Sequence, residues 1–183
     1  MTYYGGREMA ASFRTVRNNT IQIAEEIPEE QYAFKAAPDT RSVAQTLVHI
    51  AFGHRFQSHI HENRFDDFAK VNFQQLIQEI MGDENKPRTK AEIVGLLKAD
   101  GERFAAYLES LTEPFLAEPV AMPAGAQPAT KSRFEMLLSA KEHEMHHRAQ
   151  LMVLERMIGI VPHLTREFQE RMAQMQAAAQ PQR

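Results

Sequence analysis

The chain has 183 residues, of which 43% are hydrophobic and 25% are charged, and its formal net charge at pH 7 is −3. This length and composition fit one globular domain, and the small charge gives no reason to expect nucleic acid as a partner. The chain contains no cysteine, which excludes disulfides, thiolate nucleophiles and cysteine-based zinc sites.

The start of the chain, MTYYGGREMAASF, lacks the apolar core of a signal peptide. No apolar run approaches the length of a membrane span. A chain without cysteine also suits a reducing compartment. We therefore expect a cytoplasmic protein with no membrane partner.

The first helix is predicted to end before Pro28, a residue that stops helices. Its inner face repeats at alternating spacings of three and four: Phe13, Val16, Thr20, Ile23 and Ile27. A second helix is predicted from about Ser42 to about His61, because Ser42 and Gln45 have the spacing of a capping box. A short extra helix is predicted over about residues 72–81.

A third helix is predicted from Thr89, with Glu92 as its capping-box partner. Its apolar stripe is Ile93, Leu97, Phe104, Leu108 and Leu111. The linker that follows, PFLAEPVAMPAGAQPAT, contains four prolines, which argue against a helix there. A fourth helix is predicted from about Ser132 to about Ile158, before Gly159.

The sequence has no convincing strand pattern and no internal repeat. Four long amphipathic helices with one or two long crossovers predict an all-α four-helix bundle. We expect the bundle to occupy residues 1–165, and we expect residues 166–183 to form a C-terminal helical extension and tail.

The segment KEHEMHHRAQL, residues 141–151, contains H-E-x-x-H, the pattern of many zinc metalloproteases. At about 100° per residue, His143 and His147 lie about 40° apart on one apolar helix face, whereas His146 falls on a polar strip. A lone histidine on an apolar face is usually a hydrogen-bonded core residue. Two histidines one turn apart can also hold one metal ion between them.

The residues around this motif argue against a protease. Glu144 would be the general base, but it lies about 60–100° away from the histidine face. The downstream acidic residues, Glu155, Glu167 and Glu170, have no metalloprotease spacing. No edge strand is predicted that would hold a peptide substrate.

A third candidate metal ligand lies in the second predicted helix. His49 shares its face with three apolar residues, Phe52, Phe56 and Ile60. An imidazole in such a stripe needs a partner, and a metal ion shared by His49, His143 and His147 would satisfy all three. The remaining histidines are expected elsewhere: His54 in packing or another bond, His59 and His61 at the surface, and His163 in a loop.

Several segments resemble the DinB-like family, also called the YfiT/DinB metalloprotein superfamily. RSVAQTLVHIAFGHRF resembles its second helix, KEHEMHHRAQL its His-x-x-x-His-Arg-Gly-Gln-Leu signature, and RMIGIVPH its exit from the last helix. IPEEQYAFKAAPDTRSV resembles its first connection, so the resemblance covers about residues 8–163. Ala149 departs from the glycine that the family often has.

The resemblance implies an up-down-down-up four-helix bundle. Carried over residue by residue, it also implies a divalent metal ion, often nickel or zinc, bound by His49, His143 and His147 with open coordination positions. Characterised members include thiol-dependent S-transferases and isomerases. We therefore expect a metal-dependent transferase or hydrolase that acts on a small molecule, such as a low-molecular-weight thiol.

Two alternatives to an enzyme stay open. The protein could be a non-catalytic metal-binding or stress-related protein, or the three histidines could bond through water without a metal. Near the site, Glu142 and Gln150 are candidates to orient an imidazole, and Arg148 is a candidate to meet an anionic substrate. All three also fit a solvated helix surface, and no residue is assigned as general base.

A second apolar stripe on the fourth predicted helix lies nearly opposite the histidines. It consists of Phe134, Leu138, Met145 and Met152, and it ends at Arg156. The stripe fits broad burial against the first and third helices, or the interface of a homodimer, which the resemblance also implies. We expect a homodimer.

Overall fold

The structure, a computed structural model, describes residues 4–179. Its helices and strands in chain order are α1 (Gly6–Glu26), η1 (Glu29–Gln31), α2 (Val43–Phe52), α3 (Arg55–Glu62), η2 (Phe68–Lys70), α4 (Phe73–Glu84), α5 (Lys90–Glu109), α6 (Glu113–Ala117), β1 (Pro119–Ala121), β2 (Thr130–Ser132), α7 (Arg133–Met157) and α8 (His163–Ala179).

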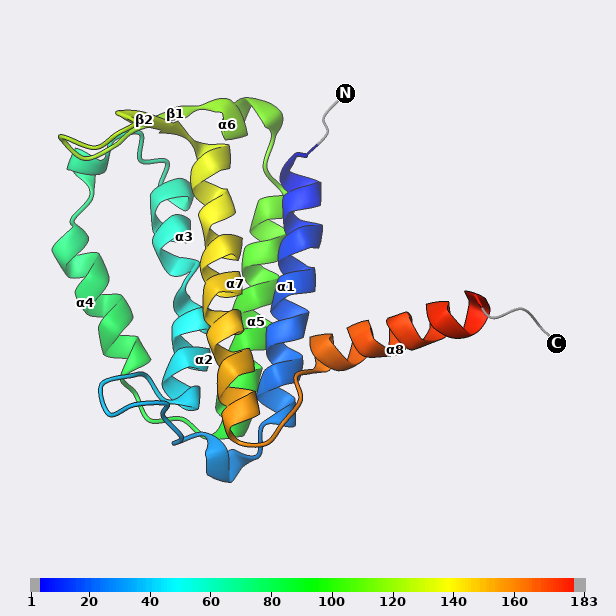
Figure 1. Ribbon diagram of the computed structural model, residues 1–183. Helices are drawn as coiled ribbons and strands as arrows, with labels where there is room; N and C mark the ends of the chain where they lie inside the picture. The colour runs from blue at the N-terminus through cyan, green and yellow to red at the C-terminus, as the bar shows by residue number, and fades with distance from the viewer. Residues whose placement is uncertain (1–3, 180–183) are drawn as a thin grey trace.

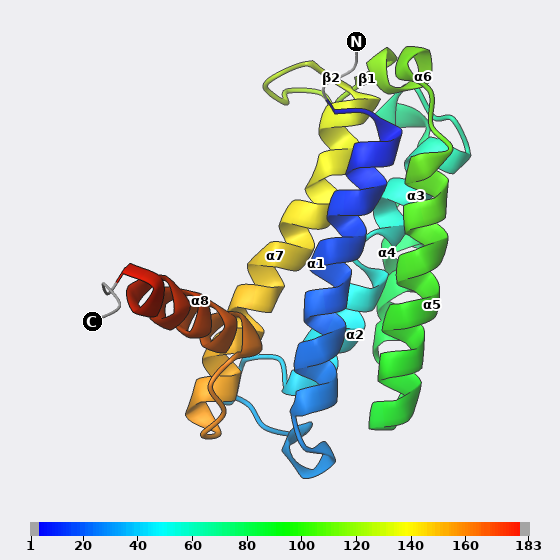
Figure 2. The same cartoon turned by 90° about the vertical axis from the view of Figure 1, so that its right-hand side faces the viewer.

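Four helical segments pack side by side as a bundle: α1, α2 with α3, α5, and α7 (Figure 1). The segment of α2 and α3 and the helix α5 both run opposite to α1, and α7 runs parallel to α1 (Figures 1 and 2). The α2–α3 segment and α5 can run parallel to each other because α4, which joins them, carries the chain back along the outside of the bundle (Figure 1). The all-α, up-down-down-up four-helix bundle is therefore confirmed.

The predicted second helix is broken into two. α2 ends at Phe52 and α3 begins at Arg55, and the amide of Gly53 bonds the carbonyl of Ile50 at 3.2 Å, which tightens the last turn of α2. The predicted start at Ser42 is correct, since its hydroxyl caps α2 and the Gln45 side chain returns the bond to the Ser42 amide.

The linker between α5 and α7 contains both a helix and strands, so the predictions against them are wrong. Pro114 lies in the first turn of α6, where a missing amide proton costs little. The three-residue strands β1 and β2 pair antiparallel, with Val120 opposite Lys131. These strands are too short to give an alternating pattern in the sequence.

The core consists of three clusters of buried apolar side chains. One fills the half of the bundle around Ile23, Leu47, Leu97 and Leu151. Another lies around Phe13, Phe104 and Leu137. The third, around Ile60, Phe68, Val120 and Met136, lies beneath the β1–β2 hairpin and the start of α4. The hairpin and α4 therefore cover one side of the bundle.

The last helix, α8, projects away from the bundle (Figures 1 and 2). His163 was expected in a loop, but it is the first residue of α8 and is buried. The predicted domain boundary at residue 165 lies within this helix and stays a prediction, and the end of the expected tail, residues 180–183, lies outside the described residues. Across residues 4–179, no helix is long and apolar enough to cross a membrane.

Candidate metal centre

The three predicted ligands meet between α2 and α7. His49 comes from α2, and His143 and His147 come from successive turns of α7. One ring nitrogen from each histidine lies within 4.8 Å of the other two. Helical periodicity alone therefore selected three side chains that the fold brings together, while their role as metal ligands stays a prediction.

Two of the imidazoles are oriented by hydrogen bonds at the nitrogen that points away from the cluster. His49 Nδ1 lies 2.8 Å from Glu84 Oε1, and His147 Nδ1 lies 2.8 Å from Gln150 Oε1. Both partners are acceptors, so each Nδ1 carries the proton and each Nε2 presents a lone pair. Gln150 thus takes the orienting role considered for it, whereas Glu142 is exposed and bonds no histidine within residues 4–179.

The sequence did not predict a role for Glu84. It is the last residue of α4, and 35 positions separate it from His49. No local pattern connects these two residues, because the contact depends on how α4 runs back along the bundle. The only available signal was a carboxylate near the end of the predicted short helix.

His143 lies against the break between α2 and α3. Its Nε2 lies 3.1 Å from His49 Nε2, and its Nδ1 is buried without a hydrogen-bond partner among the described residues. Gly53 closes over this ring, because a Cβ atom at position 53 would lie 2.5 Å from His143 Nδ1. The break between α2 and α3 therefore makes room for the histidine.

Burial keeps His143 and His147, the two cluster histidines of α7, neutral near pH 7. Burial, followed by the neighbouring His147 and His49, lowers the pKa of His143 to about 4. Burial also lowers the pKa of His147, although its hydrogen bond with Gln150 opposes this shift. Neutral imidazole is the form that binds a metal ion.

The donor set fits a divalent ion. Two nitrogens that each lie about 2.0–2.1 Å from one tetrahedral zinc ion are about 3.3 Å apart, and the two Nε2 atoms of His49 and His143 are 3.1 Å apart. His147 is 8% exposed and the His49 side chain is 19% exposed, so the His49 ring is not fully enclosed by protein. Three ligands with an open side are the arrangement of catalytic metal sites.

Glu144, the acidic residue of the H-E-x-x-H pattern, lies inside the bundle. It is 1% exposed, and both of its oxygens accept hydrogen bonds from Arg17 Nε at 3.0 Å. A carboxylate held in this way has no free oxygen to act as a general base at the histidines. The structure thus supports the case against a metalloprotease.

The other histidines do not join the cluster. The expectation that His61 lies at the surface is wrong. His61 is 1% exposed, and its two ring nitrogens bond Gln57 and Arg133 at 3.2 Å each. His54 is buried and packs on Phe104, with ring centroids 4.7 Å apart. His146 is exposed, as its place on the polar strip predicts.

The sequence and the fold both match known proteins. The sequence model of the DinB superfamily matches residues 12–151. The chain belongs to the DinB superfamily. Its relative YjoA of Bacillus subtilis (strain 168), an uncharacterised protein, is 27% identical over 153 residues, which cover 83% of this chain and 90% of YjoA. The crystal structure of YjoA matches this DinB-superfamily fold with a TM-score of 0.61, at 25% identity, over 83% of this chain and 92% of that one.

Two further solved structures share the fold at lower identity. YfiT of Bacillus subtilis, described as a probable metal-dependent hydrolase with an unusual four-helix bundle topology, has a TM-score of 0.65 at 16% identity and covers 87% of this chain and 91% of its own. A mycothiol-dependent maleylpyruvate isomerase has a TM-score of 0.61 at 13% identity, over 82% of this chain and 63% of its own. Such identities establish the DinB-superfamily fold alone.

Proposed function

We propose that this DinB-superfamily protein is a metal-dependent enzyme in which His49, His143 and His147 hold one divalent ion, nickel or zinc. The observation that carries the proposal is the convergence of three imidazoles on one point, with the His49 side chain still partly exposed to solvent. When bound, such an ion lowers the pKa of a water molecule or thiol that reaches its open side.

The residues around the ion have separate tasks. Glu84 and Gln150 hold the imidazoles of His49 and His147 in the ligating tautomer. Gly53 lets the His143 ring approach the break after α2. Glu144 is engaged by Arg17, so no protein carboxylate is assigned as general base, and proton transfer falls to groups on the substrate or to water.

We propose a small-molecule substrate, with a low-molecular-weight thiol as the leading candidate and transfer of that thiol or hydrolysis as the reaction. Two structural neighbours support these classes, since one is named as mycothiol-dependent and the other as a probable metal-dependent hydrolase. A cytoplasmic location remains a prediction from the cysteine-free composition.

The alternative is a non-catalytic protein, metal-binding or stress-related, in which the ion only stabilises the bundle. The partial exposure of His49 favours the enzyme, because a purely structural ion is usually enclosed by four protein ligands. Turnover of a thiol or ester substrate by the metal-loaded protein decides between the two.

The decisive experiment is elemental analysis of protein purified without an affinity tag, together with His49→Ala and His147→Ala. His59→Ala is the matched control, because His59 lies on α3 and its ring stacks on Phe65. We expect about one equivalent of metal in the wild type and in the control, and none in the other two variants. Failure of the wild type to take up nickel or zinc would rule out the metal centre.

We also propose that the protein is a homodimer. Within the predicted stripe, Phe134 and Leu138 pack into the core and only Met145 is strongly exposed, so burial within the bundle explains most of it. The better candidate surface is the projecting α8, where Phe168 and Met175 are 59% and 58% exposed. An isolated helix with an uncovered apolar face is stabilised when a second copy covers it.

A further inference from the structure

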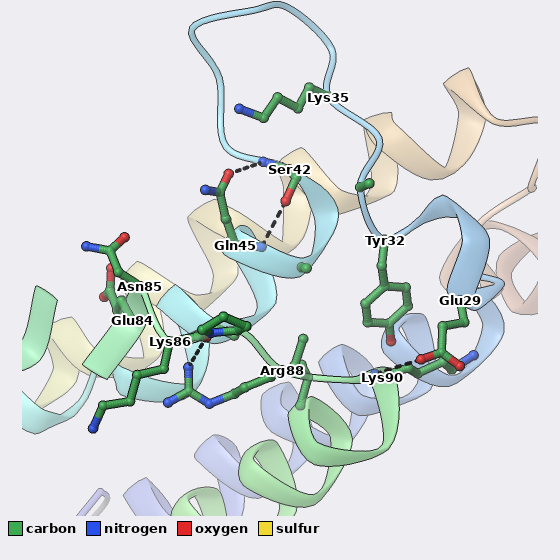
Figure 3. A pocket seen from close by; sticks show the side chains of 15 residues that line it. Glu29, Tyr32, Lys35, Ser42, Gln45, Glu84, Asn85, Lys86, Arg88 and Lys90 are labelled. Atoms are coloured by element: carbon green, nitrogen blue, oxygen red, sulfur yellow. Dashed lines mark hydrogen bonds between the residues drawn. The ribbon is translucent and has the colours of Figure 1, made fainter. Parts of the chain in front are cut away.

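A cavity of about 550 Å³ lies at the end of the bundle, and Figure 3 shows the side chains that line it. Its walls are the residues after η1, the first turns of α2, the end of α4 and the loop that leads into α5. Cavities of this size accommodate small organic molecules. None of the three histidines lines it.

Cationic side chains predominate in the cavity wall. Four line it: Lys35, Lys86, Arg88 and Lys90. Lys86 pairs with Asp83 at 2.5 Å, whereas the other three form no ion pair with any carboxylate in the described part of the chain. Lys90 Nζ donates to the carbonyls of Glu25 and Ile27, which leaves its charge uncompensated.

Lys35 and Arg88 have the most donors to spare. Lys35 is exposed and its ammonium group bonds no described residue. Arg88 is half-buried, lies over the Phe52 ring and donates one hydrogen bond, to the carbonyl of Lys86 at 3.0 Å. Its guanidinium keeps further N–H groups for a ligand, in a geometry that suits a carboxylate or phosphate.

The two acidic residues of the wall are already engaged. Glu84 bonds His49, and Glu29 accepts the backbone amide of Lys90 at 3.3 Å. The first amides of α2 are also engaged, because Val43 and Ala44 donate to the carbonyls of Phe34 and Tyr32. An anion in this cavity would therefore be held by the basic side chains rather than by the helix terminus.

Glu84 connects the cavity to the metal centre. It lines the cavity and bonds His49 Nδ1 at 2.8 Å, and Gln45, another wall residue, lies one turn before His49 on α2. The Glu84 carboxylate therefore lies between a molecule in the cavity and the His49 ring.

We propose that this cavity binds a small molecule through its carboxylate or phosphate group, and that Glu84 couples occupancy of the cavity to the metal centre. The link to the ion rests on the proposed function, whereas anion binding by the cavity does not. The ligand class is therefore an anionic small molecule that the basic side chains of the wall, Lys35 and Arg88 among them, would bind.

Anion binding can be tested on the metal-free protein at pH 7.5 by ¹H–¹⁵N NMR titration with inorganic phosphate and with malonate. Malonamide, a neutral analogue of malonate, is the ligand control. We expect shifts of the backbone amides around Gln45 and residues 85–90, with one dissociation constant for each anion. The tighter of the two anions identifies the group that the cavity selects, and shifts that fail to localise there overturn the proposal.

Three variants and a control sharpen this test. Lys35→Gln and Arg88→Gln should each weaken malonate and phosphate binding about tenfold, and Arg88→Lys should restore part of the loss. Arg7→Gln removes the same charge from the opposite end of the bundle and should change nothing. Amide spectra of each variant verify its fold, and equal anion affinities across all four variants contradict the assignment.

Cobalt, as the metal alone, tests the link to the histidines. In cobalt-loaded protein, malonate should change the visible absorption spectrum with a midpoint that rises about tenfold in Arg88→Gln and stays unchanged in Arg7→Gln. A midpoint that is equal in all three proteins would separate the cavity from the metal centre. If no cobalt binds, the proposed function fails, while the NMR titration still decides whether the cavity takes anions.

Discussion

The carboxylate of Glu144 pairs with the guanidinium of Arg17, with Oε2 2.9 Å from Nη2 and both side chains buried. Arg17 also donates to the carbonyl of Leu97 at 3.0 Å and to that of Ile50 at 3.3 Å. One ion pair thus joins α1, α2, α5 and α7. Gly101 makes space for it, because a Cβ atom at that position would lie 2.8 Å from Arg17 Cγ.

Removal of either partner of this pair should destabilise the protein without abolishing metal binding. We expect Glu144→Gln to lower the free energy of unfolding by about 3–5 kcal/mol, because Arg17 would remain buried without its counter-charge. Chemical denaturation measures the loss, and Glu142→Gln, an exposed carboxylate on the same helix, is the control. Loss of bound metal from folded Glu144→Gln would instead place Glu144 in the metal centre.

Glu84→Ala should weaken metal binding and leave the fold intact. Without the carboxylate, the Nδ1 proton of His49 loses its acceptor, and the loss of such a partner weakens metal affinity about 10–100-fold. Competition with a metal chelator measures the change. Glu79→Ala, on the exposed side of α4, is the matched control, and equal affinities of the two variants would deny Glu84 its orienting role.

Gly53→Ala should impair the metal centre through His143. The added methyl group would lie 2.5 Å from His143 Nδ1 and 2.8 Å from Cε1, so the ring must move away from His49. We expect at least a tenfold loss of metal affinity, on the scale of disrupted ligand orientation. Gly95→Ala meets no atom within 4 Å and should stabilise α5 by about 0.5–1 kcal/mol. Unchanged metal binding by Gly53→Ala would contradict the close packing at this ring.

Glu155 should make stability fall as the pH rises. Its two carboxyl oxygens are buried without a hydrogen-bond partner among the described residues. Burial, followed by the nearby Glu26, raises the pKa of Glu155 from its ordinary value of 4.5 to about 7. Between these two values the folded protein binds a proton that the unfolded chain releases, so the stabilising contribution is complete below about pH 4.5 and lost through pH 7.

Glu155→Gln should remove this loss. Relative to the wild type, we expect the variant to gain up to about 3 kcal/mol in the free energy of unfolding between pH 4.5 and pH 8.5. Denaturation curves at several pH values measure the difference, with Glu142→Gln as the exposed control. A difference between variant and wild type that does not depend on pH would show that Glu155 is ionised normally in the folded protein.

The apolar face of α8 should carry the proposed dimer. Phe168→Asp combined with Met175→Asp places two charges in an interface that excludes water, so the variant should elute as a monomer. Size-exclusion chromatography with light scattering gives the mass directly. Gln174→Asp, on another face of the helix, should remain a dimer, and a monomeric wild type would refute the assembly.

The sequence by itself determined the features that depend on neighbours a few residues away. The capping residues Ser42 and Thr89 begin α2 and α5 as predicted, because a cap bonds amides within its own turn. The pairing of His143 with His147 follows from helical periodicity. The apolar stripe around His49 likewise shows that this imidazole faces the interior, where the fold places it against the other two.

Only the tertiary structure decided the partners that lie far away in the chain. Arg17 and Glu144 are separated by 127 positions, and His49 and Glu84 by 35. Such contacts depend on the path of each connection and on the depth at which a polar side chain is desolvated. The same reason explains the burial of His61 against Arg133 and the break at Gly53. Packing against distant residues decides both, while the local sequence remains compatible with a continuous helix.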